Sequence, residues 1–548
     1  MTKVRRPKRW DKPFSKDMSD AIVTRVLSTK ALSHLNAGNF SDSLPLSGII
    51  ANDTRIVYFK KGEVIVRKGE YGGSAFLTLS GDVAIIKNEV GLEIETKKPT
   101  GLFNFFKAAK STRLLDFPLF TTHNKEEHLT LSPQFQHFIE QYPDNYITLE
   151  ADSFYGEIAA LARGTRTATV FSKTDTEILE IGWQGLRDLM RYDAQIREQV
   201  RALYKQHSLL VQLRNTKFLS HLKAEQLQQL NEQSLFENYG KFEWQRSFQK
   251  VKNDEDVNST LKIEPIIAQQ GDYVDGLLLI SSGFARLSKT INHGEKTIGY
   301  LKQGDTFGFE ELVHNWRTGE EIDYQHSLRA IGYVDIIRIP TSSIEKYAFA
   351  HIDEALLPTL INDHDNLDYD IDTGILEQLV EKRFINGSST MVIDRHRCTG
   401  CDDCVSACAS LHDGQARFNR NGAHIDKYAI THACMHCTDP VCLIGCPTGA
   451  IHRSGQLGNI IIDDNTCIGC SGCANSCPYE NIIMREVFDD SGQALLDEQN
   501  GTPLLKASKC DLCIGHGSIP ACEQACPHDA LKRLDMGNIA SFADWFNR

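Results

Sequence analysis

Polar and apolar residues alternate with a period of two in two segments of this chain that lie far apart in the sequence. The segments span residues 59–83 and 266–283, and glycines interrupt both of them at short intervals. Such alternation between glycine turns predicts short antiparallel β-strands. Two similar openings, Ala31–Leu35 and Phe218–Leu222, start stretches of similar length, each running from a short helix through strands into a helical stretch. We therefore predict two copies of one small antiparallel β-barrel with flanking helices.

These two copies set the predicted domain plan of a multidomain α+β chain. The first copy covers residues 31–212, contains an insertion over about residues 90–146, and ends in a stretch whose helical spacing predicts a connecting helix over residues 183–212. The second copy covers residues 213–372. The remaining segments are a basic tail, a linker that includes a short helix, and a C-terminal domain, over residues 1–30, 373–390 and 391–548.

Length and charge limit the classes of function. The chain has 548 residues and a formal net charge of −13, so it has room for several cores, and its overall balance does not suggest nucleic-acid binding. The basic start, Lys3 to Arg9, lacks the apolar segment of an export signal. No stretch approaches the roughly 18 apolar residues of a membrane span. We expect a cytoplasmic protein whose tail is a solvated arm, with contact to an acidic partner as the alternative.

All sixteen cysteines lie between Cys398 and Cys526, in four groups of four. The third group has the bacterial ferredoxin spacing C-x2-C-x2-C-x3-C-P, and the first has the same spacing with Ala409 in place of the proline. Groups two and four widen the gap before the third cysteine and keep the final C-x3-C-P. In chain order the groups are Cys398, Cys401, Cys404 and Cys408; Cys434, Cys437, Cys442 and Cys446; Cys467, Cys470, Cys473 and Cys477; and Cys510, Cys513, Cys522 and Cys526.

This spacing predicts four 4Fe-4S clusters. A two-residue gap returns successive thiolates to the same side of a loop, so three of them can hold three irons of a cubane, and the fourth thiolate must come from elsewhere. Zinc also takes soft thiolates, but zinc sites use two separated pairs rather than triplets followed by a fourth cysteine and a proline. Disulfides do not fit a long acidic chain with no export signal and no cysteine in its first 397 residues.

A family resemblance becomes specific in the second group. Residues 432–451, HACMHCTDPVCLIGCPTGAI, resemble the second cysteine group of the four-cluster ferredoxin subunits that serve molybdopterin oxidoreductases such as dimethyl sulfoxide reductase, and related hydrogenases and dehydrogenases. The order of the groups is also similar, over about residues 390–536. The resemblance implies a bacterial-ferredoxin-like α+β domain in which groups one and four share two clusters and groups two and three share the other two.

A second resemblance lies in the first barrel. Residues 155–170, YGEIAALARGTRTATV, closely resemble the phosphate-binding cassette of cyclic nucleotide-binding domains, which are jelly-roll barrels. Glycine lets the backbone approach the ligand at a helix N-terminus, glutamate can accept from a ribose hydroxyl, and arginine can fork onto the phosphate. Thr167 is a weak pointer to cGMP over cAMP, because family members that prefer guanine carry this residue type there. The candidate ligand residues are Gly156, Glu157, Ile158, Ala159, Arg166 and Thr167. A barrel that keeps the motif without binding is the alternative.

The second barrel departs from this pattern. Phe309 interrupts its Gly-Glu step, and alignment of the following strand puts Tyr324 where Arg166 stands. Without the arginine, a buried phosphate would lack its counter-charge, which is costly. We therefore expect the second copy to be a degenerate module that is structural or holds two copies of the chain together.

These observations predict an iron–sulfur electron-transfer protein. No nucleotide-redox fingerprint, flavin motif or nucleophile–base pair supports catalysis by this chain alone, so we expect a non-catalytic subunit of an oxidoreductase complex. Its partner would be a flavin, NAD(P) or molybdopterin oxidoreductase, and cyclic nucleotide in the first barrel would regulate electron transfer through the connecting helix. The alternative is a cyclic-nucleotide or redox sensor without net electron flow.

Overall fold

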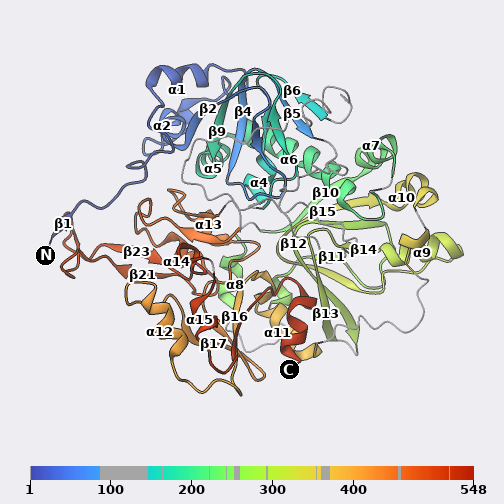
Figure 1. The fold of residues 1–548 in the computed structure, drawn as a ribbon. Helices are drawn as coiled ribbons and strands as arrows, with labels where there is room; N and C mark the ends of the chain where they lie inside the picture. The colour runs from blue at the N-terminus through green and yellow to red at the C-terminus, as the bar shows by residue number, and fades with distance from the viewer. Residues whose placement is uncertain are drawn as a thin grey trace, which may run out of the picture.

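The computed structural model describes residues 2–86, 146–162, 164–220, 222–241, 243–251, 260–291, 294–352, 354–358, 371–454, 458–517 and 519–547. Most of the predicted insertion over residues 90–146 lies outside these ranges. Figure 1 shows three groups of elements side by side: a first domain at the top in blue and teal, a second domain at the right in green and yellow, and a cysteine domain at the lower left in orange and red.

The first domain is built from two antiparallel four-stranded sheets. Their strand orders are β2-β9-β4-β7 and β3-β8-β5-β6, and apolar side chains from both sheets, such as Phe76 and Val83, form one core. The elements are α1 (Asp20–Leu27), η1 (Ala37–Asn39), α2 (Leu46–Asp53), β2 (Thr54–Phe59), β3 (Val64–Val66), β4 (Ser74–Ser80), β5 (Val83–Ile86), β6 (Tyr146–Leu149), β7 (Phe154–Tyr155), α4 (Glu157–Ala162), β8 (Val170–Ser172), β9 (Thr176–Gly182), α5 (Trp183–Tyr192) and α6 (Ala194–Asn215).

The second domain repeats this plan around two long bent strands. β12 and β15 pair along most of their length, with register shifts where they bend, in the sheet order β10-β15-β12-β13. Its elements are α7 (Ala224–Gln233), β10 (Leu235–Gly240), α8 (Gln245–Val251), η3 (Leu261–Ile263), β11 (Ile266–Ala268), β12 (Gly276–Ile291), β13 (Gly294–Lys302), β14 (Thr306–Phe307), α9 (Phe309–Thr318), β15 (Ser327–Pro340), α10 (Thr341–Tyr347), η4 (Phe349–His351) and η5 (Glu354–Leu356). Strands and turns alternate as the sequence predicts; closure of either domain into a complete barrel stays a prediction.

The cysteine domain has two similar halves. In each half, a strand before one cysteine group pairs antiparallel with a strand after another: β16 with β24, and β20 with β19. Its elements are α11 (Thr373–Glu381), η6 (Phe384–Asn386), β16 (Thr390–Asp394), α12 (Asp403–Ser410), β17 (Asn419–Ile425), β18 (Tyr428–His432), α13 (Val441–Ile444), β19 (Ile451–Arg453), β20 (Ile460–Ile462), α14 (Gly472–Ser476), β21 (Ile483–Glu486), β22 (Leu496–Asp497), β23 (Leu505–Ser508), η7 (Ile514–His516), α15 (Ala521–Gln524), β24 (Leu531–Leu534) and α16 (Ile539–Phe546).

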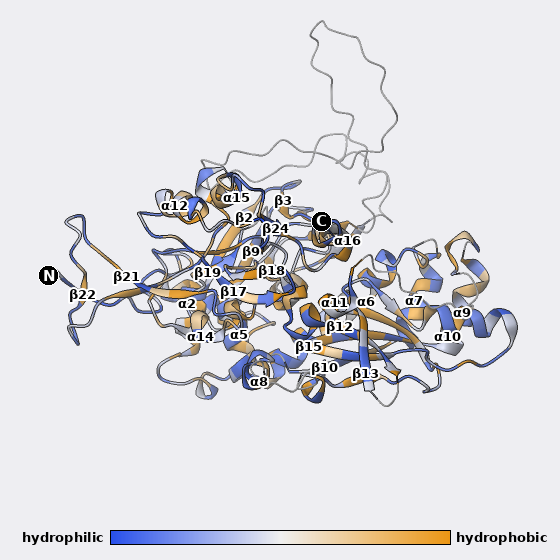
Figure 2. Ribbon diagram, turned by 90° about the horizontal axis from the view of Figure 1, so that it is seen from below, coloured by the Kyte–Doolittle hydropathy of each residue, from blue (hydrophilic) through white to orange (hydrophobic). Residues whose placement is uncertain are grey.

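The second domain and the cysteine domain share one hydrophobic core. Phe284, Tyr300 and Ile331 of the second domain pack with α11, η6 and the end of the cysteine domain, where the Tyr300 hydroxyl donates to the Met536 carbonyl at 3.0 Å. The predicted linker over residues 373–390 is therefore largely buried helix. In Figure 2, hydrophobic ribbon lies along β12 and β15, most of whose apolar residues form the separate core of the second domain itself.

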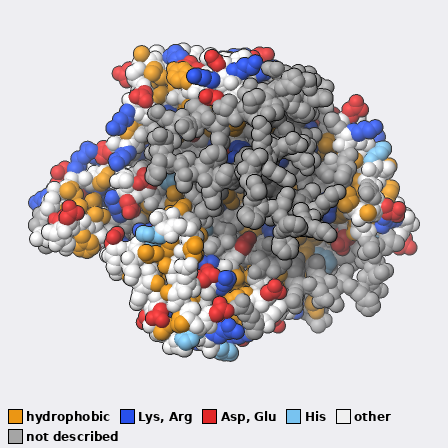
Figure 3. Space-filling model, in the orientation of Figure 1, with side chains coloured by type: hydrophobic (Ala, Val, Ile, Leu, Met, Phe, Trp, Pro, Cys, Tyr) orange, Lys and Arg blue, Asp and Glu red, His pale blue; other side chains and the backbone are white. Residues whose placement is uncertain are grey.

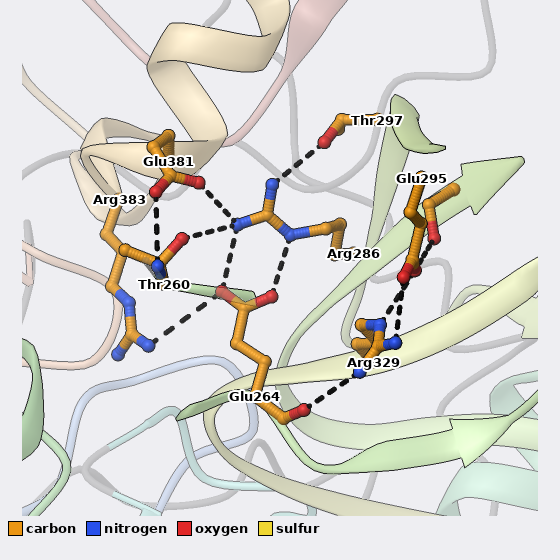
Figure 4. A network of polar contacts seen from close by, with 9 residues as sticks. Thr260, Glu264, Arg286, Glu295, Thr297, Arg329, Glu381 and Arg383 are labelled. Atoms are coloured by element: carbon orange, nitrogen blue, oxygen red, sulfur yellow. Dashed lines mark hydrogen bonds and ion pairs between the residues drawn. The ribbon is translucent and has the colours of Figure 1, made fainter. Parts of the chain in front are cut away.

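A buried ionic network crosses the same junction (Figure 4). Arg286, which is 1 % exposed, donates from Nε to Glu264 at 2.7 Å and from Nη2 to Glu381 of α11 at 3.1 Å. Burial opposes the charge of Arg286, but these two carboxylates raise its pKa above the ordinary value. The guanidinium of Arg383 lies 3.9 Å from Glu264 and stacks on Trp244.

The sequence suggested that the basic tail, residues 1–30, is a solvated arm, and this prediction is wrong. β1 (Lys3–Val4) pairs in parallel with β22 of the cysteine domain, and Figure 2 shows the N-terminus beside β22. In Figure 1, β1 lies at the far left, next to the end of the cysteine domain that carries β21 and β23. Arg9 forms ion pairs of 2.7 Å with Asp53 and Asp188 of the first domain. Residues 20–27 form α1, whose Val23 and Val26 enter the core of the first domain. Strand pairing and ion pairs hold a segment that composition alone assigns to solvent.

The repeated openings, residues 31–35 and 218–220, form hydrogen-bonded turns, with Leu32 donating to Thr29 and Leu219 to Thr216. The short helices that precede the strands are α2 and α7. One local prediction needs correction. The connecting helix is two helices, because Asp193 leaves the helical conformation and its side chain caps α6 at the Ile196 amide. Across the residues that the structure describes, no helix has the length and apolar character needed to cross a membrane.

Candidate metal centres and nucleotide site

The sixteen cysteines gather into four sets of four. Two of the sets line hollows of about 320 Å³ each, and both combine three cysteines of one group with the last cysteine of another. Set A is Cys398, Cys401, Cys404 and Cys526, and set D is Cys446, Cys467, Cys470 and Cys473. The other two are defined by the thiols that interact with one another: set B is Cys408, Cys510, Cys513 and Cys522, and set C is Cys434, Cys437, Cys442 and Cys477.

The order of the sets follows from the helices. Cys404 and Cys408 lie one turn apart on α12, so sets A and B are neighbours, and Cys473 and Cys477 relate sets D and C in the same way through α14. Cys434 and Cys510 pack against each other, which joins set C to set B. The sets therefore form a row A-B-C-D. Cys401 of set A and Cys470 of set D are exposed, so both ends of the row reach the surface.

Left-handed backbone shapes the loops that bring the first three thiols of a group together. Gly469 has φ +65°, and a Cβ there would lie 2.0 Å from the Leu505 carbonyl, so only glycine fits. Ser471 and Asp402 hold corresponding positions in groups three and one, with φ of 62° and 65°. These turns return the chain so that the cysteines face one hollow.

The environment of the thiols fits an iron–sulfur cluster. Burial, with Cys446 and its neighbours, raises the pKa of Cys473 to about 12, and burial raises the pKa of Cys437 well above the ordinary thiol value, with Cys434 adding to the effect. Four thiolates this close in a buried site need a positive group to balance them, and the irons of a cluster supply it. Backbone amides also point at sulfur: Asn481 donates to Cys477 at 3.4 Å.

Two cations near these sets, Lys509 and Arg533, were not predicted from the sequence. Lys509 immediately precedes Cys510 and donates to its carbonyl at 2.9 Å. Arg533 donates from Nη2 to the Cys510 sulfur at 3.0 Å. His436 is fully buried, and its Nδ1 accepts from the Ile460 amide at 3.0 Å, which agrees with a supporting role; His396 is exposed and His528 lines the hollow of set A.

The predicted nucleotide residues converge in the first domain. Arg166 is buried and donates from Nη1 to the carbonyls of Ser74 and Gly156, at 2.7 and 3.0 Å. Burial lowers the pKa of Arg166 to about 10, although Glu180 and Glu157 act in the opposite direction. Gly156 has φ +80° and opens α4, whose first residues are Glu157, Ile158 and Ala159; Glu157 and Ala159 are buried, and Ile158 and Thr167 are half-buried. A Cβ at Gly72 would lie 2.1 Å from Arg166, so a glycine cradle holds the guanidinium.

Tyr324 takes the place of Arg166 in the second domain. The Arg166 backbone exchanges hydrogen bonds with Gly69 and Glu70, and the Tyr324 backbone does so with Gly271 and Asp272. The Tyr324 hydroxyl donates to the Gly276 carbonyl at 3.0 Å, as Arg166 donates to Ser74. Here a neutral phenol fills the space in which the first domain keeps a cation.

Known proteins match both parts of the molecule. The family described as a 4Fe-4S dicluster domain matches residues 425–536, and the family described as a cyclic nucleotide-binding domain matches residues 260–351. The sequence and the sulfur sets thus define a multicluster ferredoxin domain joined to a jelly-roll-like cyclic nucleotide-binding fold, and the two families inferred from the sequence are confirmed. The matched nucleotide-binding range lies in the second domain, so the cassette at residues 155–170 of the first domain stays a prediction.

Curated proteins with similar sequences show which kind of ferredoxin domain this is. The chain is 34 % identical over 166 residues to the thiosulfate reductase electron transfer subunit PhsB of Salmonella typhi, covering 27 % of this chain and 78 % of that one. It is 32 % identical over 167 residues to the B subunit of anaerobic dimethyl sulfoxide reductase of Escherichia coli (strain K12), covering 27 % and 72 %. The protein belongs to this family of iron–sulfur electron-transfer subunits.

Other matches cover less or are more distant. The chain is 37 % identical over 166 residues to the NADH-dependent phenylglyoxylate dehydrogenase subunit beta of Aromatoleum evansii, covering 29 % of this chain and only 33 % of that protein's length. Among solved structures, the regulatory domain of Toxoplasma gondii PKA with cAMP is 12 % identical, with a TM-score of 0.21, covering 60 % of this chain and 91 % of that one.

Proposed function

We propose that this protein carries single electrons between two redox partners through four 4Fe-4S clusters, and that cyclic nucleotide bound in the first domain regulates this transfer. Sets A, B, C and D would each hold one cluster, and Gly156, Glu157, Ile158, Ala159, Arg166 and Thr167 would hold the nucleotide. When bound, the clusters supply one-electron chemistry; the chain's own residues position them, exclude water from sets B and C, and expose the two ends of the row. The row of four sulfur sets with exposed ends carries the proposal of a relay.

Regulation is supported by a contact between the nucleotide site and the cysteine domain. Tyr71 bridges to Thr165, next to Arg166, and a Cβ at Gly458 would lie 2.0 Å from the Tyr71 ring. The guanidinium of Arg453 lies 4.9 Å from the centre of the same ring and donates to the Cys437 carbonyl at 2.8 Å. A shift of the loop at Tyr71 when nucleotide binds would therefore reach the backbone of set C.

Two further contacts place the first domain on the loops of set D. Arg187 of α5 donates to the carbonyls of Ile444 and Cys446, at 2.8 and 3.3 Å. Arg6 of the arm donates to the Ile468 and Gly469 carbonyls, at 3.2 and 2.7 Å. We call these contacts of Arg187 and Arg6 the set D clasp.

The proposal also covers the partner and the setting. The relatives serve oxidoreductase complexes, so we propose a flavin, NAD(P) or molybdopterin oxidoreductase as partner and the reducing cytoplasm as the place of action. On the face seen in Figure 3, acidic and basic side chains are interspersed over the described surface, without the continuous basic patch typical of nucleic-acid binding.

We retain the domain plan inferred from the sequence, with two jelly-roll barrels, the second of them structural or dimerising.

Metal analysis tests the relay. Protein purified without oxygen should contain about sixteen irons and sixteen acid-labile sulfides per chain, as four cubane clusters require. Stoichiometric zinc with little sulfide would contradict the proposal.

Spectroscopy tests the regulation. Adding cyclic nucleotide should change the electron paramagnetic resonance of the reduced clusters, and Tyr71→Ala should abolish this change while nucleotide still binds. Tyr273→Ala is the matched control, because Tyr273 holds the corresponding position in the second domain and is 58 % exposed. A nucleotide response without any electron transfer to an oxidoreductase would favour the sensor instead.

A further inference from the structure

The junction between the two halves of the cysteine domain contains a cation that touches a cluster sulfur. Arg533, on β24, donates from Nη2 to the Cys510 sulfur at 3.0 Å and from Nη1 to the Cys434 carbonyl at 3.1 Å. Its second Nη1 bond, at 3.0 Å to the Ser389 carbonyl, fixes the guanidinium between set B and set C.

Other sulfur contacts in the described parts of the molecule come from neutral donors. The amides of Arg417, Asn481 and Ala530 donate to Cys408, Cys477 and Cys526, at 3.3, 3.4 and 3.3 Å, and the Thr448 hydroxyl lies 3.7 Å from the Cys446 sulfur. Set B thus differs from the other sets because a positively charged guanidinium donates a hydrogen bond to one of its sulfurs.

A second buried cation lies beside the same junction. Lys509 is 3 % exposed, and its ammonium donates to the carbonyls of Ile460 and Cys510. Two cations thus lie at the junction of sets B and C, and one of them donates directly to a sulfur. Arg420 lines the hollow of set A, but the described part of the chain shows no hydrogen bond from it to a cysteine sulfur.

Charge of this kind affects the two oxidation states of a cluster differently. Reduction adds one electron and hence one negative charge to the cluster, so a fixed cation and a charge-assisted hydrogen bond to sulfur stabilise the reduced form more than the oxidised form. The effect is larger in a buried site than in water, because the local dielectric constant is lower.

We propose that Arg533 raises the reduction potential of the set B cluster above the potentials of the terminal sets A and D. An electron that leaves an iron–sulfur or flavin partner then rests at the centre of the row, where one iron of the set B cluster is reduced from ferric to ferrous with no proton transferred and no bond broken. This inference rests on the proposed relay. Arg533 acts as a positioning residue through Cys510 and touches no substrate.

The experiment is a redox titration of the full chain followed by electron paramagnetic resonance. Cys513→Ser identifies the set B signal as the one that changes. In the parent protein this signal should have a higher midpoint potential than the signals of sets A and D, and Arg533→Gln should shift it to a lower one. Lys532→Gln is the matched control, because it removes the same charge from the adjacent residue, whose ammonium pairs with Glu523 at 2.7 Å and touches no sulfur.

The outcomes separate this inference from the relay itself. An unchanged set B midpoint in Arg533→Gln, or an equal shift in Lys532→Gln, overturns the role of Arg533 while full iron content leaves the relay intact. If Arg533→Gln loses iron, Arg533→Lys replaces it, since it keeps the charge and loses the planar donor fork; its midpoint should then lie below that of the parent, and an unchanged midpoint overturns the inference. Parent protein without four clusters would refute both proposals.

Discussion

The first and second domains share one fold but differ in how they meet the cysteine domain. The second contributes Phe284 and Tyr300 to a common core and closes its ligand space with Tyr324. The first keeps Arg166 in a glycine cradle and reaches the cysteine domain through polar contacts at Tyr71 and the set D clasp. The copy with the candidate nucleotide site is thus the copy that does not share a hydrophobic core with the cysteine domain.

The two kinds of junction have different energetic consequences. Separating the second domain from the cysteine domain would expose apolar surface, which costs about 25 cal/mol of free energy for each Å². It would also remove the ion pair between Arg286 and Glu381 of α11. The contacts of the first domain are hydrogen bonds from arginine, each with a net value of about 1.5–3 kcal/mol, and water can replace them. A ligand can therefore shift the first domain, whereas the second domain serves as a platform.

Breaking the ionic network should have the largest effect. Arg286→Met would leave Glu264, which is fully buried, without its main partner, and we expect the free energy of unfolding to fall by about 3–5 kcal/mol. Denaturant unfolding of the second and cysteine domains together measures it. Arg329→Met is the control, because the pair of Arg329 with Glu295 is more exposed and stays within the second domain. Equal losses in both variants would mean that the network does not join the domains.

Removing the cradle cation should affect only the first domain. Arg166→Ala is expected to weaken cyclic nucleotide binding by about 2–5 kcal/mol, since a buried phosphate would lose its counter-charge. Calorimetry should find one site per chain, and Tyr324→Phe should leave the affinity unchanged. Two equivalent sites, or an unaffected Arg166→Ala variant, would contradict the contrast between the domains.

Loosening the set D clasp should have a moderate effect. Arg187→Gln removes charge-assisted bonds to Ile444 and Cys446, so opening of α5 should become easier by about 1.5–3 kcal/mol. Hydrogen exchange of the α5 amides measures this change, while the amides of β12 serve as the unchanged reference. Uniform exchange in both regions of the variant would indicate general destabilisation instead.

The smallest effect is expected at Thr167. If its hydroxyl donates to a guanine base, Thr167→Ala should reduce cGMP affinity by about 0.5–1.5 kcal/mol and leave cAMP affinity unchanged. Competition binding of the two nucleotides gives the ratio directly. Equal affinities in the parent protein would remove the basis for a cGMP preference and leave the Arg166 site unaffected.

Local spacing made part of this protein predictable. The sequence predicts most of each sulfur set, because three of its four cysteines belong to one group. It also predicts the candidate nucleotide site, whose proposed residues lie within the twelve consecutive positions from Gly156 to Thr167. The fold of both repeated domains follows from alternation and glycine turns in the same way.

Long-range contacts were not predictable from such patterns. Arg533 and Arg286 are single cations without any periodicity, and their partners, which are distant in sequence, become neighbours only in the folded chain. The N-terminal tail was assigned to solvent because it is a run of basic residues; its long-range partners are Asp53, Asp188 and β22. Tertiary pairing decided these positions.

The pairing of β1 with β22 also has a consequence for how the protein is made. Lys3 leaves the ribosome long before its neighbour Leu496, because the two residues lie far apart in the sequence. At about 5–20 residues per second, the arm waits tens of seconds for that strand. Arg6 likewise finds its carbonyl acceptors only after the loop from Cys467 to Cys470 has taken shape. The segment from Lys3 to Arg6 can therefore close over the third cysteine group only after that group has been synthesised and its loop has formed.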